Sequence, residues 1–293
     1  MTIISFLQST PIAFIVLVGL LGLIVGSFLN VVIYRLPVML ERSWHTQCSE
    51  LLDLPEQEIE DNNKQPFNLS VPRSRCPHCG HTIRAIENIP VLSYLFLRGR
   101  CANCKSPISI RYPLIEFFTG LLSVIVVWQL GFGWEAAGAL VLTWSLIALS
   151  MIDYDHQLLL DNITLPFLWL GLFLSLFGLY TDTHSSIIGA LAGYLSLWTV
   201  YQLFKLFTGK EGMGYGDFKL LAMLGAWMGW QMLPIIILLS SLVGAVVGIS
   251  LIIVAGRERS KPIPFGPYLA AAGWIALLWG KQLTALYLTI AGI

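Results

Sequence analysis

The stretch IAFIVLVGLLGLIVGSFLNVVIY, residues 12–34, decides the fold class of this chain. Its 23 residues include no Asp, Glu, Lys or Arg, and about 20 apolar residues in a helix are enough to cross a bilayer. A secretory signal peptide would carry basic residues before such a run and a small-residue cleavage site after it. Neither feature is present, so we expect residues 12–34 to remain in the mature protein as a membrane span.

Seven further apolar runs follow this first one, at about 113–130, 136–152, 163–181, 186–208, 217–232, 234–254 and 267–290. The composition agrees, because 56% of the residues are hydrophobic and only 12% are charged, against about 25% charged in soluble domains. We predict an all-α polytopic membrane protein with about eight transmembrane helices, in contact with the lipid bilayer. The sixth run is short and could instead be re-entrant.

The basic residues predict the orientation of these spans. Ten of the seventeen Lys and Arg residues lie between Arg35 and Arg111. Two later loops hold six more: Lys205, Lys210, Lys219, Arg257, Arg259 and Lys261. The positive-inside rule places all three loops in the cytoplasm and both termini outside. A re-entrant sixth run would put residues 257–261 outside, so eight spans agree better. Because the net charge is zero, we expect no nucleic-acid partner.

We divide the chain into three parts. Residues 1–34 form the first span, residues 35–112 a cytoplasmic domain, and residues 113–293 a seven-helix membrane domain. Within the cytoplasmic domain, residues 50–64 are acidic and poor in aromatic side chains, which is typical of a solvated loop. Residues 72–112 are richer in Cys, Pro, Gly and Arg, so we expect a small folded module there.

That module contains two CxxC pairs, formed by Cys76, Cys79, Cys101 and Cys104. A CxxC turn directs two thiolates at one ion, and two such turns complete a tetrahedral zinc site with four cysteine ligands. Such a site has no open ligand position, so we predict a structural zinc. The alternative is a pair of disulfides, which are rare in the reducing cytoplasm. We do not expect His78 or His81 to be ligands, and we expect Cys48 to be a free thiol.

Two carboxylates are predicted to meet at one face of the membrane. Asp153 lies at the cytoplasmic end of the third run, and Asp217 lies at the start of the sixth. Ionisable residues at membrane depth indicate function by default. A carboxylate pair that shares one proton suits peptide hydrolysis, because one group activates water while the other polarises the scissile carbonyl.

The neighbours of these two residues receive weaker assignments. The glycines at 212, 214 and 216 are interpreted as a loop whose open backbone lets an extended substrate approach Asp217. Asp155 and Asp161 are interpreted as polar loop residues. Lys219 is expected either to set the local field or to reach the membrane interface.

These segments resemble one family, the bifunctional type IV prepilin peptidases. Gly214-Tyr215-Gly216-Asp217 matches the GxGD signature of membrane aspartyl proteases, within GMGYGDFKLLAMLGAWMGW at 212–230. Asp153, in IDYDHQLLLDNITLP, resembles the family's first catalytic segment. Four more segments fit: GSFLNVVIYRLP at 26–37, the CxxC pairs, NIPVLSYLFLRGRC at 88–101 and RYPLIE at 111–116. Leu160 stands where the family commonly has Pro, and this change leaves both aspartates intact.

The resemblance implies the activities. Asp153 and Asp217 would cleave the leader from type IV prepilins or type II secretion pseudopilins at the cytoplasmic face of the bacterial inner membrane. The same protein would then methylate the new N-terminus with S-adenosylmethionine, for which we assign no residues. The oligomeric state stays open.

Two other classes of function fit the sequence less well. A proton-coupled transporter would place its carboxylates near the membrane midplane within inverted repeats, and we find no repeat. A membrane scaffold whose zinc module binds partners would leave the GxGD segment without a role.

Overall fold

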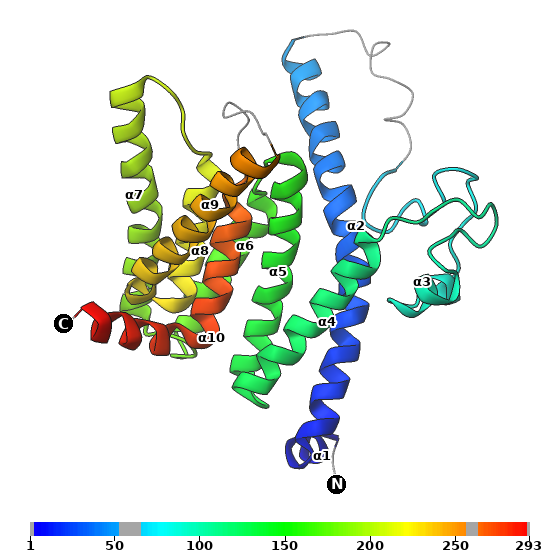
Figure 1. Cartoon of the computed structure of the whole chain (residues 1–293), viewed down its shortest axis with the longest axis horizontal. Coiled ribbons are helices and arrows are strands. Elements are labelled where there is room, and N and C mark those ends of the chain that lie inside the picture. Colours follow the sequence, from blue (N-terminus) through cyan, green and yellow to red (C-terminus); the bar gives the residue numbers. More distant parts are fainter. Residues whose placement is uncertain (1–2, 53–65, 256–262, 292–293) are drawn as a thin grey trace. The chain divides into compact units, whose positions relative to one another are not determined.

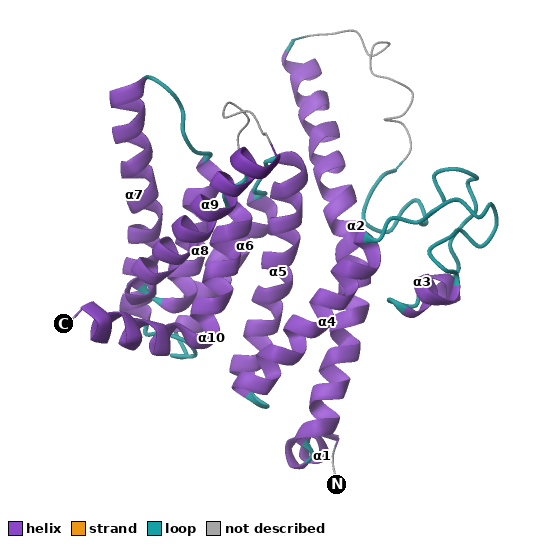
Figure 2. Ribbon diagram, viewed as in Figure 1, coloured by secondary structure: helices purple, strands orange, loops and turns teal. Residues whose placement is uncertain are grey.

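The computed structural model describes residues 3–52, 66–255 and 263–291, and this part of the chain is predominantly helical (Figures 1 and 2). Its α-helices are α1 (Ile3–Ser9), α2 (Pro11–Leu51), α3 (Leu92–Phe96), α4 (Arg111–Leu130), α5 (Trp134–His156), α6 (Asp161–Ser175), α7 (Thr183–Thr208), α8 (Tyr215–Met228), α9 (Leu233–Ala255) and α10 (Gly266–Ala291). Two short 3₁₀ helices, η3 (Ala85–Asn88) and η4 (Trp230–Met232), complete the set. Each of the eight predicted spans corresponds to one helix, so the all-α class is confirmed.

The lengths of the helices refine the expected number of spans. Among the described residues, six helices are long and apolar enough to cross a membrane: α2, α4, α5, α7, the helical segment Trp230–Ile253 that contains most of α9, and α10. The two others, α6 with 15 residues and α8 with 14, fall short of the about 20 residues that a bilayer requires. Residues 53–64 of the acidic segment and the basic cluster at 257–261 lie outside the described residues.

The chain divides into two compact units, residues 1–128 and 129–293. In the first unit α2 packs against α4 where both helices carry small residues. A Cβ atom added to Gly22 would lie 2.9 Å from the Gly120 backbone, and one added to Gly26 would lie 2.7 Å from the backbone of Glu116. Close approach through small residues is the usual way in which membrane helices associate.

Helix α2 continues well past the predicted boundary at residue 34, so that boundary falls inside a continuous helix. Beyond it, the buried Arg35 side chain donates hydrogen bonds to the carbonyl oxygens of Asn68 at 2.8 Å and Pro72 at 2.6 Å. Residues 72–110, here called the cysteine module, are therefore fastened to α2 at their first residue.

In the second unit α8 occupies the centre, in contact with α6, α7, α9 and α10. Every residue from Leu220 to Met228 is buried. Helices α7 and α8 approach most closely where Gly189 meets Gly225, since a Cβ atom on Gly225 would lie 2.1 Å from the Gly189 carbonyl oxygen. A helix enclosed in this way meets other helices rather than lipid, which explains how so short a segment can be so apolar.

One contact between α6 and α8 is made by an aromatic side chain. The Trp227 indole N–H donates a hydrogen bond to the Phe167 carbonyl oxygen at 2.7 Å. Its ring fills the space above Gly171, where an added Cβ atom would lie 2.4 Å from the indole. Trp227 is therefore a packing residue between α6 and α8.

Candidate functional site

Asp153 lies three residues before the end of α5, and only 5% of its surface is exposed. Its Oδ2 atom accepts a hydrogen bond from the backbone N–H of Gly266 at 3.0 Å. Gly266 is the first residue of α10, and the first N–H groups of a helix have no partner within the helix. The carboxyl group of Asp153 therefore satisfies the start of a helix that is 113 residues away in sequence.

Asp217 is the third residue of α8 and is 7% exposed. It lies near enough to Asp153 for the two carboxyl groups to interact electrostatically. Leu159 packs beside a neighbour of each carboxyl group, since its side chain would lie 2.6 Å from a Cβ atom on Gly216, which precedes Asp217, and 3.1 Å from one on Gly266, which binds Asp153. The structure thus brings together the two carboxyl groups that the sequence singled out.

The glycines before Asp217 have different surroundings. Gly214 is the residue before α8, and a Cβ atom there would meet only the Asp217 carboxyl group, at 3.9 Å. Gly216, by contrast, lies inside α8 against Leu159, and Gly212 lies against the ring of Phe204. The interpretation of all three as an open substrate loop is therefore wrong for Gly216, whose missing side chain serves internal packing.

Three charged neighbours are also placed differently from expectation. Asp155 is an exposed residue of α5 rather than of a loop. Asp161 begins α6, and both of its carboxylate oxygens accept hydrogen bonds from the Lys219 ammonium group at 2.7 Å. Lys219 lies on α8, two residues after Asp217. The pair ties α6 to the helix that carries Asp217, and sequence reasoning missed it because the partners are 58 residues apart.

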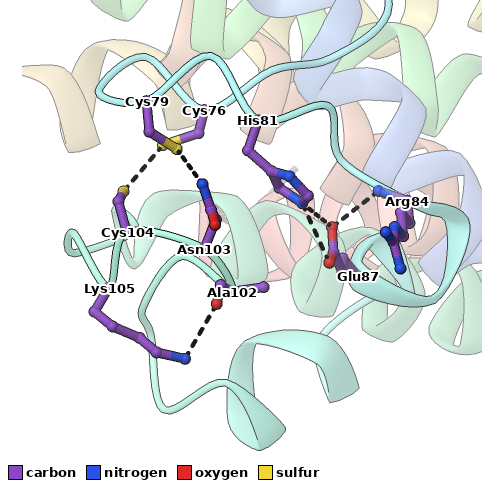
Figure 3. Close-up of polar contacts among 9 residues, drawn as sticks. All are labelled: Cys76, Cys79, His81, Arg84, Glu87, Ala102, Asn103, Cys104 and Lys105. Carbon is purple, nitrogen blue, oxygen red and sulfur yellow. Dashed lines mark hydrogen bonds and ion pairs between the residues drawn. The ribbon is translucent and has the colours of Figure 1, made fainter.

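The four cysteines of the module converge, with all of their sulfur atoms within 4.8 Å of one another. Figure 3 shows three of them, Cys76, Cys79 and Cys104. The Sγ atoms of Cys76 and Cys104 are 3.8 Å apart. Zinc–sulfur bonds of about 2.3 Å in a tetrahedron place the sulfur atoms about 3.8 Å apart. A disulfide requires about 2.05 Å, and the four thiols are free in the structure. The donor set and its spacing therefore fit a metal ion.

Backbone amides prepare this cluster for a cation. The N–H groups of Cys79 and His78 lower the pKa of the Cys76 thiol to about 6. Hydrogen bonds from Ser106 lower the pKa of Cys104. Because thiolates are the form that binds metal, these contacts favour the binding form of Cys76 and Cys104, whereas burial raises the pKa of the Cys79 thiol.

The module's second polar contact lies away from the sulfur atoms. His81 contacts the Glu87 carboxylate, with 3.1 Å between Nε2 and Oε2, and the same carboxylate accepts a hydrogen bond from the Arg84 backbone N–H (Figure 3). The described metal-competent cluster contains the four cysteines and neither His78 nor His81. Cys48 lies apart from it, exposed on α2.

Comparison with known proteins finds one family match over the region of the cysteine module and another over the region of the two aspartates. The family described as "Bacterial Peptidase A24 N-terminal domain" matches residues 20–130, and "Type IV leader peptidase family" matches residues 140–249. A protein of Stutzerimonas stutzeri named "Prepilin leader peptidase/N-methyltransferase" is 59% identical over 291 residues, which cover 99% of each chain. The chain belongs to the type IV leader peptidase family.

Other members of the type IV leader peptidase family show the same extent of similarity. A protein of the same name from Pseudomonas aeruginosa is 57% identical over 293 residues, covering 100% of this chain and 99% of the relative. One from Dichelobacter nodosus is 53% identical, covering 97% and 98%. No solved structure matches. The leader peptidase match at 140–249 includes both aspartates, and the six membrane-capable helices make this member a multi-pass membrane protein.

Proposed function

We propose that this chain is a membrane aspartic endopeptidase that removes the leader of type IV prepilins or type II secretion pseudopilins and then methylates the new N-terminus. The observation that carries the proposal is the meeting of Asp153 and Asp217, two buried carboxyl groups from the ends of separate helices. Family membership supplies the substrate class, since the relatives are named prepilin leader peptidases and N-methyltransferases.

The cleavage step needs only groups that the two aspartates supply. One carboxylate, ionised, takes a proton from a water molecule that attacks the scissile carbonyl. The other, protonated, donates a hydrogen bond to the carbonyl oxygen, where negative charge develops. The intermediate collapses as the C–N bond breaks and the leaving amine takes up the proton that the first carboxylate removed from water. Because water is the nucleophile, no covalent enzyme intermediate forms. The Gly266 N–H orients the Asp153 carboxyl group throughout, because it binds one oxygen and leaves the other for water or substrate.

The position of the pair suits a substrate that enters from one side of the membrane. Asp153 is near the last residue of α5 and Asp217 near the first residue of α8, so both lie at helix ends rather than at helix centres. We place this end, with the cysteine module, on the cytoplasmic side of the inner membrane, where the positive-inside rule puts the basic loops. A transporter would instead hold its carboxylates near the midplane.

Two cofactors belong to the proposal. Cys76, Cys79, Cys101 and Cys104 would hold a structural zinc ion, which joins the two CxxC turns and leaves no coordination site for substrate. S-adenosylmethionine would donate the methyl group to the amine that cleavage exposes. No residue is assigned to the methyl donor.

The test uses the full chain in proteoliposomes with a synthetic prepilin, and the products are weighed by mass spectrometry. The expected products are the free leader and a mature chain that becomes one methyl group heavier when S-adenosylmethionine is added. Asp153→Asn should abolish cleavage, because the amide keeps the shape of the side chain and cannot ionise.

Asp155→Asn is the matched control, since the same exchange two residues away in the same helix should leave cleavage intact. A folded Asp153→Asn protein that cuts prepilin at the wild-type rate would refute the assignment of the pair.

A further inference from the structure

We propose that the cysteine module dips into the membrane surface through an apolar face and holds anionic lipid with arginines at its rim. The apolar face consists of five exposed side chains on η3, α3 and the turn between them: Ile86, Ile89, Leu92, Leu95 and Phe96. The most exposed, Phe96 and Ile86, show 84% and 79% of their surface. This inference needs α4 to span the membrane, and it does not depend on the peptidase reaction.

The apolar face includes a strained turn at Val91. This strain indicates that contacts with the rest of the first unit fix the orientation of the face. Val91 has φ 60° and ψ −47°, a conformation rare for a β-branched residue. The Leu92 N–H donates a hydrogen bond to the Pro90 carbonyl oxygen across it, forming a γ-turn. Such a turn persists only where its surroundings hold it.

Glu116 of α4 supplies that hold. Its Oε2 atom accepts a hydrogen bond from the Val91 N–H at 2.8 Å, and the Glu116 side chain is buried and also hydrogen-bonded to Ser27 of α2. A buried carboxylate with these partners fixes the apex of the turn to both membrane helices of the first unit. The apolar face therefore has a defined height along α4.

That height lies within the membrane. Helix α4 has 20 residues, so it is about 30 Å long and only just equals the hydrocarbon thickness of a bilayer. To cross, it must begin close to the boundary between headgroups and acyl chains, at Arg111. Glu116 is five residues further on, about 7.5 Å along the axis. The backbone of Val91 thus lies at the depth where interfacial apolar side chains are found.

The charges around the face match a bacterial lipid surface. Arg84, Arg98 and Arg100 are exposed on the segments that flank it. Long basic side chains beside apolar ones are typical of elements that lie in the interface, since they reach lipid phosphates while the apolar groups contact acyl chains. If these five large apolar side chains faced water instead, nothing would cover them, and large exposed apolar patches usually mark a site of interaction.

The experiment places the photoreactive residue p-benzoylphenylalanine at Phe96 in the full chain, reconstituted in vesicles of phosphatidylethanolamine and phosphatidylglycerol. Irradiation should join it to lipid acyl chains, which mass spectrometry detects. His78, exposed within the first CxxC turn, is the matched control position. We expect about tenfold more lipid adduct at position 96 than at position 78, because only the apolar face enters the acyl region.

The results that would overturn the proposal, and the role of the arginines, can be tested in the same system. Equal adduct at both positions, or adduct with added prepilin in place of lipid, would overturn it, and the second result would assign the face to the substrate. Replacing Arg98 and Arg100 with Gln should lower the yield in anionic vesicles and leave it unchanged in phosphatidylcholine. An unchanged yield in both would remove the lipid-binding role of the rim. The photocrosslinking should give the same lipid adduct in Asp217→Asn protein, because the proposal does not depend on the peptidase reaction.

Discussion

In the cysteine module, four thiols from two short turns meet with hardly any apolar core beneath them, and only Cys76 and Cys101 are buried. In α8, Asp217 stands at the head of a helix whose residues from Leu220 to Met228 are all buried among other helices. The module therefore depends on whatever joins its sulfur atoms, while the second unit (residues 129–293), here called the helical unit, depends on close packing. Loss of a metal ion should damage the cysteine module and spare the helical unit. A methyl group added where α7 meets α8 should do the opposite.

The largest effect should come from the carboxyl pair. Asp217→Asn should lower the rate of prepilin cleavage by roughly a thousandfold or more, and combining it with Asp153→Asn should cost little further, because residues that act as a unit fail together. Zinc content and the methylation of a pre-cleaved pilin should stay at wild-type levels. Mass spectrometry of both reactions, with metal analysis, checks all three.

The contrary result would be a double variant whose loss of cleavage rate, relative to wild type, equals the product of the two single losses. The two aspartates would then act independently.

The next largest effect is expected in the cysteine module. The wild-type protein should contain about one zinc per chain, and Cys101→Ser should lose most of it, because three thiolates bind the ion less firmly than four. Limited proteolysis should then cut within residues 72–110 more rapidly, while the thermal unfolding of the helical unit stays unchanged. Cys48→Ser, outside the cluster, should keep its zinc. A metal-free module with wild-type resistance to protease would contradict this expectation.

A substitution that disturbs the packing of α7 against α8 should destabilise the helical unit and leave the cysteine module intact. Gly225→Ala places a methyl group 2.1 Å from the Gly189 carbonyl oxygen, and overpacking of this kind costs about 1–3 kcal/mol. The unfolding temperature of the helical unit should fall while zinc content is unchanged.

Gly248→Ala in α9 is the matched control, since its new Cβ atom meets Ile263 at an ordinary 3.4 Å. It should be neutral, or stabilising by up to about 1 kcal/mol through helix propensity. Equal loss of stability in both variants would show that the contact between α7 and α8 is not special.

The smallest effect concerns the ion pair between α6 and α8. Its side chains are 49% exposed for Asp161 and 30% for Lys219, and partly exposed pairs contribute at most about 1 kcal/mol. Asp161→Asn should therefore slow cleavage by no more than about fivefold, with Asp155→Asn unchanged. A thousandfold loss in Asp161→Asn would move this residue into the catalytic machinery.

Local patterns in the sequence predicted much of this architecture. Eight apolar runs correspond to eight helices, because hydropathy is encoded residue by residue. The cysteine spacing predicted the sulfur cluster, because each CxxC turn positions its own pair of ligands. Topology alone brought Asp153 and Asp217 to the same level, although their catalytic role stays a prediction.

What the sequence did not reveal depends on contacts between remote segments. The Gly266 N–H reaches Asp153 across 113 residues, and Lys219 reaches Asp161 across 58. No periodicity encodes such pairs. The role of Gly216 was misread for the same reason, because its neighbour Leu159 belongs to another segment. The extent of α2 beyond residue 34 was missed because its second half is polar and was interpreted as a cytoplasmic segment.

The shortness of α8 bears on how the protein is made. With 14 residues, including Asp217 and Lys219, this segment is too short and too charged at its start for the insertion machinery to accept it alone. Helix α7, with 26 residues, is long enough, and its small residues fit against α8. We therefore expect the two helices to enter the bilayer as a hairpin, so that Asp217, one of the two proposed catalytic groups, reaches its place only together with α7.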